Sequence, residues 1–123
     1  MRIISKKIQK LWKNRDISII CGEGIFDNIE VNIFDCASSI DYQYAPNHNA
    51  FKDYDKILNQ ALTIDKNRLI IIILGPTASV LACDLTVQGY QALDLGHIAK
   101  DYNSFVLNSN KDKKELKKFF APD

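Results

Sequence analysis

The sequence has an unbroken apolar run at residues 69–74, in the middle of the chain. This run limits the possible folds of the chain more than any other feature. The run holds two leucines and four isoleucines, so both of its faces are apolar and β-branched residues dominate it. Such a segment is typical of a central strand in a parallel sheet that is covered on both sides. Gly75 and Pro76 break the run at once, and Thr77 can cap a helix that follows.

The rest of the chain alternates between two kinds of segment. Some are short and apolar, or alternate apolar with polar residues, and others have apolar residues at helical spacing. We expect further strands at residues 17–21, 41–45 and 90–95. Apolar periodicity predicts helices over residues 1–14, 49–62 with Asn49 as N-cap, 77–87 and 99–107, and a short helix within 29–39. Alternation of this kind predicts one α/β domain over residues 1–123, a Rossmann-like three-layer sandwich with a mainly parallel sheet of about four strands. The basic C-terminal segment, 108–123, is expected to form a surface helix.

Composition excludes several classes of function. Sixteen Lys and Arg against fifteen Asp and Glu give a net charge of +1, which offers no overall attraction to nucleic acid or to an anionic membrane. The three cysteines, Cys21, Cys36 and Cys83, are widely spaced and form no metal or disulfide motif, as expected for free thiols in the cytoplasm. We expect the first residues to form neither a signal peptide nor a membrane span, because polar and basic residues interrupt their apolar positions.

The carboxyl ends of parallel strands meet at one edge of a sheet, and ligands of such sheets bind there. We therefore expect residues 22–24, 46–49, 75–77 and 94–97 to lie along one rim. Each group also has a simpler interpretation: the 75–77 turn connects a strand to a helix, and Asp94 caps the turn before His97. Glu23 and Asn49 can likewise be a solvated acid and a helix cap.

Five segments, taken in order, resemble the C-terminal part of the GT-D glycosyltransferases: residues 12–24, 32–40, 45–58, 69–85 and 89–98. The most specific are LIIIILGPTASVLACDL and, shortly after it, GYQALDLGHI. The resemblance implies a Rossmann-like domain that takes a sugar from a UDP-sugar donor, with Mn²⁺ or Mg²⁺, and passes it to a glycan acceptor. It also implies a role in bacterial surface polysaccharide or glycoprotein synthesis.

The resemblance carries over to individual residues. It implies that His97 and Asp94 are catalytic, with His97 also a metal ligand. It implies that the donor is held by Glu23, Asn49, Gly75, Pro76 and Thr77. A helix N-terminus and a histidine suit these roles because both can contact a diphosphate.

Two departures from the family pattern shape the functional prediction. The acidic D-x-E metal motif of the family is absent, and residues 99–105 lack the first acid and the tryptophan of the usual E-Y-E-W-like run. We therefore predict a glycosyltransferase domain that acts with a separate N-terminal half or as a homo-oligomer. The alternative is a noncatalytic nucleotide-binding or interaction module, whereas a generic nucleotide-binding protein is disfavoured because no G-x-G-x-x-G follows the first strand.

Overall fold

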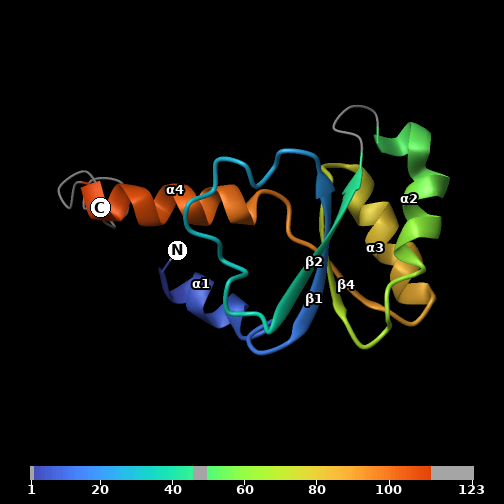
Figure 1. Cartoon of the computed structure of the whole chain (residues 1–123), viewed down its shortest axis with the longest axis horizontal. Coiled ribbons are helices and arrows are strands. Elements are labelled where there is room, and N and C mark those ends of the chain that lie inside the picture. Colours follow the sequence, from blue (N-terminus) through green and yellow to red (C-terminus); the bar gives the residue numbers. More distant parts are fainter. Residues whose placement is uncertain (1, 46–49, 112–123) are drawn as a thin grey trace.

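The computed structural model describes residues 2–45 and 50–111, and in this part of the chain a four-stranded sheet forms the centre (Figure 1). The strands are β1 (Asp16–Gly22), β2 (Ser39–Ala45), β3 (Leu69–Ile73) and β4 (Gln91–Asp94). They lie in the order β2-β1-β3-β4, and every neighbouring pair is parallel. The predicted α/β fold with a parallel sheet is confirmed.

Helices cover both faces of this sheet (Figure 1). On one side lie α2 (Tyr54–Ala61), which follows a 3-10 turn at Ala50–Asp53, and α3 (Thr77–Val87). On the other side lie α1 (Arg2–Gln9), the loop of residues 23–38 and α4 (Ile98–Lys111). Because β3 is buried along its whole length, its alternate isoleucines contribute to both cores, as its apolar run predicts.

The predicted helix within residues 29–39 is wrong, because this segment is an irregular loop. Its backbone makes tight turns, and the Asn32 side chain accepts the Phe34 N–H at 2.9 Å. The N–H groups of Glu30 and Val31 bond to the Asn103 side chain, which ties this loop to α4. Phe34 and Ile33 nevertheless bury fully and cover the sheet in place of a helix.

Helix boundaries also differ from the prediction at several points. The leading helix ends at Gln9 and continues as turns to Asn14, whose φ of 60° marks the reversal into β1. The N-cap position of α3 is Pro76 rather than Thr77, and no side chain caps this helix. Thr77 is instead its first helical residue, with a buried side chain that is 7% exposed. The predicted roles of Asn49 and of residues 46–49 and 112–123 lie outside the described residues.

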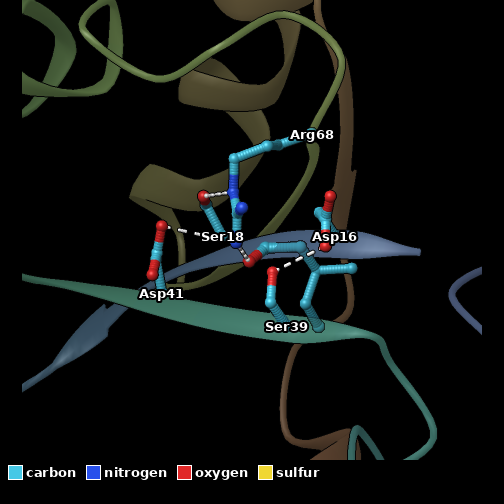
Figure 2. Close-up of polar contacts among 6 residues, drawn as sticks. Asp16, Ser18, Ser39, Asp41 and Arg68 are labelled. Atoms are coloured by element: carbon cyan, nitrogen blue, oxygen red, sulfur yellow. Dashed lines mark hydrogen bonds and ion pairs between the residues drawn. The ribbon is translucent and has the colours of Figure 1, made fainter. Parts of the chain in front are cut away.

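The half-buried guanidinium of Arg68 links the strands at the amino end of the sheet (Figure 2). Arg68, just before β3, donates to the Ser18 hydroxyl at 2.9 Å and to the Ile17 carbonyl in β1. It also forms an ion pair with Asp41 of β2, at 3.4 Å. Arg68 therefore links the start of β3 with two other strands, at the edge opposite to the predicted rim.

In the described ranges, no helix is long and apolar enough to cross a membrane.

Candidate functional site

The carboxyl ends of the parallel strands place three of the predicted loops along one edge of the sheet. Gly22 ends β1, Ile73 ends β3 two residues before Gly75, and Asp94 ends β4. The chain runs from β1 outward to β2 in one direction, whereas β3 and β4 lie in the other direction. The sheet therefore has its topological switch point between β1 and β3, where ligands of open α/β sheets bind.

A cavity of about 320 Å³ opens at this edge, between the loop after β1 and the start of α4. This volume lies at the lower end of the roughly 300–1,000 Å³ found for small-molecule sites. Ile73 contributes from the end of β3, Gly24, Ile25 and Asn28 from the loop, and His97 from the turn after β4. Two predicted rim segments, 22–24 and 94–97, thus meet around one cavity.

Two glycines with left-handed backbone conformations line the cavity. Gly24 has a φ of 81° and Gly96 a φ of 57°, a region that other residues enter only with strain. A Cβ on Gly24 would also lie 3.2 Å from the Asp27 carboxylate. Both loops therefore depend on glycine to turn at the cavity mouth.

The N-terminus of α4 supplies the positive character of the site. The His97 carbonyl accepts the Asp101 N–H at 3.0 Å, so the helix begins directly after His97. Lys100, an exposed residue in the first turn, also lines the cavity. Because free N–H groups and the helix dipole favour anions at this end, the cavity suits a phosphate or diphosphate. Sequence reasoning missed Lys100, although its position three residues after His97 in a predicted helix could have pointed to it.

Asn103 shapes the cavity from within α4. Its side chain is 8% exposed, and its Oδ1 accepts the N–H groups of Glu30 and Val31 at 2.9 and 2.8 Å. These bonds hold the loop after β1 against the helix, so Asn103 both lines the cavity and fixes its opposite wall. Sequence reasoning missed Asn103 too. Its only signal was its position four residues after the apolar Ala99, which places both residues on the same side of the predicted helix.

The remaining rim residues form a second group on the α3 side. One carboxylate oxygen of Asp94 accepts the Ser79 hydroxyl at 2.9 Å, and the other accepts the Gly96 N–H at 3.2 Å. Asp94 thereby ties the turn before His97 to the first turn of α3. Gly75, Pro76 and Thr77 lie at the same edge but do not line the cavity.

Comparison with known proteins identifies the family. A family model described as glycosyltransferase GT-D fold matches residues 2–122. The chain belongs to the GT-D glycosyltransferases. The GT-D chain is 36% identical over 104 residues to the probable glycosyl transferase Gly of Streptococcus gordonii, covering 85% of this chain and 15% of that protein. It is 37% identical over 97 residues to glycosyltransferase GlyD of Streptococcus pneumoniae serotype 4, covering 79% and 12%.

Solved structures agree with the GT-D assignment. A highly conserved domain of unknown function 1792 with a distinct glycosyltransferase fold superposes with a TM-score of 0.82 at 40% identity, over 87% of this chain and 39% of that one. A new glycosyltransferase of the same domain type from Streptococcus sanguinis gives 0.79 at 36% identity, over 85% and 39%. The GT-D chain therefore spans about two fifths of these solved chains.

The expected metal ion would need several side-chain ligands that converge on one point. Within the described ranges, no three His, Cys, Asp or Glu side chains converge on a point that could hold a metal. Both oxygens of Asp94 are already hydrogen-bonded, and Glu23 is an exposed residue of the loop after β1. The described residues do not by themselves complete a Mn²⁺ or Mg²⁺ site, so the metal and the role of His97 as its ligand stay predictions.

Proposed function

We propose that this chain binds the diphosphate of a UDP-sugar donor in the rim cavity and forms the donor-binding part of a glycosyltransferase. The observation that carries the proposal is the joint presence of the α4 N-terminus, His97 and Lys100 at the switch point of the sheet. The relatives named as glycosyltransferases support the transfer of a sugar to an acceptor. The proposal includes a glycan acceptor, a cytoplasmic reaction and the synthesis of bacterial surface polysaccharides or glycoproteins.

The chemistry of sugar transfer explains why positive groups belong at this cavity. The bond between the anomeric carbon and the diphosphate oxygen breaks, and its electron pair leaves with the diphosphate. An acceptor hydroxyl forms the new bond to the anomeric carbon and loses its proton. The ammonium group of Lys100 and the N–H groups that begin α4 favour the charge that develops on the leaving group.

His97 and Asp94 receive different roles in this proposal. The exposed imidazole of His97 borders the cavity, where a ring N–H can donate to a phosphate oxygen. The hydrogen bonds of Asp94 to Ser79 and Gly96 support a positioning role, because they fix the turn that carries His97. When bound, a Mn²⁺ or Mg²⁺ ion would neutralise part of the diphosphate charge.

Calorimetric titration with UDP, with and without Mn²⁺, tests the donor site. We expect saturable binding that His97→Ala and Lys100→Ala each weaken by about ten- to a hundredfold, as for loss of one charge-assisted hydrogen bond. Lys56→Ala is the matched control, because Lys56 is an exposed lysine of α2 on the other side of the sheet. A folded chain that binds no UDP in either condition would refute the proposal.

Transfer is measured separately, with radiolabelled UDP-glucose and UDP-galactose and a glycan acceptor. Because the chain spans 15% and 12% of its two curated relatives, the assay is run alone and with the remaining portion of such a relative. UDP binding without transfer in either arrangement would favour the alternative, a noncatalytic nucleotide-binding module.

A further inference from the structure

Two tyrosines stand side by side on the edge strand β2. Tyr42 and Tyr44 are two residues apart in the strand, so both side chains project from the same face of the sheet. Their rings are stacked, with centroids 6.0 Å apart and an interplanar angle of 2°. They are 36% and 53% exposed, which is unusual for two adjacent aromatic side chains of a sheet.

Aromatic residues that reach into the core hold the Tyr42 ring in place, and Tyr42 supports Tyr44. Phe26 meets the Tyr42 ring edge-on at 5.5 Å and also contacts Phe34 at 6.3 Å. Phe34 in turn packs against the buried Trp12, with ring centroids 4.9 Å apart. A ligand that binds the tyrosine pair therefore finds it already ordered, which lowers the entropic cost of binding.

Polar groups border the aromatic surface. Burial raises the pKa of the Tyr42 hydroxyl, a hydrogen bond from Asn32 lowers it, and the negative charge of Asp35 adds to the rise. The Asn32 amide and the exposed Asp35 carboxylate therefore both act on the Tyr42 hydroxyl. The exposed ring of Tyr44, backed by the parallel ring of Tyr42, matches a hexopyranose, whose C–H face packs on an aromatic ring while its hydroxyls hydrogen-bond to polar groups at the ring edge.

The tyrosine pair is separate from the cavity proposed for the donor. Ile25 and Asn28 of the loop after β1 line the cavity, whereas Phe26 of the same loop packs against Tyr42. Neither Tyr42 nor Tyr44 lines the cavity. One loop thus has the donor cavity on one side and the tyrosines on the other, an arrangement suited to two different ligands.

We propose that Tyr42 and Tyr44 form a binding surface for a hexopyranose ring of the acceptor glycan. Describing the glycan as an acceptor rests on the proposed function, whereas binding of a pyranose rests on the aromatic surface alone. The exposed ring of Tyr44 contacts the apolar face of the sugar, Tyr42 supports that ring, and the tyrosine hydroxyls contact the hydroxyls of the sugar.

Saturation-transfer NMR on the whole chain tests the surface with two probes, cellotriose and tri-N-acetylchitotriose, and with sorbitol as a ringless polyol control. At millimolar concentrations we expect saturation at the axial ring protons of at least one trisaccharide and none at sorbitol. Tyr44→Ala should weaken binding by about three- to tenfold, and Tyr44→Phe should retain it, because the ring makes the contact. Val87→Ala, which alters an apolar residue of α3 that is 78% exposed, is the matched control.

Circular dichroism of each variant confirms folding before binding is compared. The proposal is overturned if neither trisaccharide is saturated, or if Tyr44→Ala binds as well as the unaltered chain. It is also overturned if sedimentation shows self-association that Tyr44→Ala abolishes, since the pair would then be a protein contact. Glycan binding without UDP binding would defeat the donor proposal alone, and UDP binding without glycan binding would defeat only the tyrosine surface.

Discussion

Asn103 links the stability of the fold to the shape of the cavity proposed for the donor, and Asn103→Ala is the variant that measures this link. Its Oδ1 accepts two backbone N–H groups from the loop after β1, and the side chain is 8% exposed. Truncation to alanine removes both bonds and leaves the N–H groups of Glu30 and Val31 without this acceptor. We therefore expect a less stable protein with a loosened cavity wall.

The magnitude follows from the two bonds. Each contributes about 0.5–1.5 kcal/mol net, and a partly buried N–H left without a partner costs more, so Asn103→Ala should lower the free energy of unfolding by about 2–3 kcal/mol. Asn103→Asp keeps an acceptor of nearly the same shape and should lose less than half of that. The UDP affinity of Asn103→Ala should fall by about three- to tenfold, because binding must then order the loop.

Urea denaturation and calorimetry with UDP measure the two effects, and hydrogen exchange localises them. In Asn103→Ala, exchange should accelerate most at the amides of Glu30 and Val31. Asn108→Ala is the matched control, since Asn108 is an exposed asparagine of the same helix. The reasoning fails if Asn103→Ala unfolds within about 0.5 kcal/mol of the unaltered chain, or if Asn108→Ala loses as much stability.

Further variants test other parts of the structure. Arg68→Ala should lower the free energy of unfolding by about 2 kcal/mol in urea titrations and leave UDP affinity unchanged. Asp41→Asn should lower the free energy of unfolding by less than about 1 kcal/mol, because the Asp41 carboxylate is 71% exposed. Equal losses of stability in the two variants would contradict this reasoning. Exposed Cys83 should react with a thiol reagent in the folded chain, and buried Cys21 only after unfolding. Burial raises the pKa of Cys21 from 9.0 to about 11, so its contribution to stability is complete below pH 9 and is lost as pH rises through 11; Cys21→Ala should flatten that pH profile. Asp94→Ala should weaken UDP binding in calorimetry, whereas Asp94→Asn should largely preserve it, because the carboxamide can still position the turn. An equal loss in both variants would mean that the charge of Asp94 contacts the ligand directly.

The sequence was sufficient to predict the elements whose pattern is local. The apolar run of β3 predicts a buried central strand, and all five of its residues are buried. The end of α3 is equally local: Gly89 has a φ of 95°, and the Tyr90 N–H bonds back to the Leu85 carbonyl at 3.0 Å, as in glycine-terminated helices. Parallel pairing then follows from the alternation of strands and helices, and it places the predicted loops at one edge.

The loop between β1 and β2 could not be predicted in this way. Its apolar residues suggest a helix, but the segment folds as a loop that two hydrogen bonds tie to Asn103, more than 70 residues further along the chain. No local spacing reveals a partner at that distance. The same reason explains why Lys100 and Asn103 were missed, since they belong to the cavity only because the loop folds against α4.

The path of the chain after β4 explains why the predicted rim residues separate into two groups. Thr77 begins α3, and Ala78 next to it is buried in the core on that side of the sheet, whereas Ala99 of α4 is buried in the core on the opposite side. The turn at residues 95–97 therefore carries the chain across the carboxyl edge, and Asp94 anchors its start to α3 through Ser79. A donor confined to the cavity would contact the α4 N-terminus alone. For the turn at residues 75–77 to take part as well, the diphosphate must lie across the edge above Ile73, which ends β3 and lines the cavity. A helix N-terminus is thus available twice at this edge, from opposite faces of the sheet, and the length of the proposed donor would decide whether it contacts one helix or both.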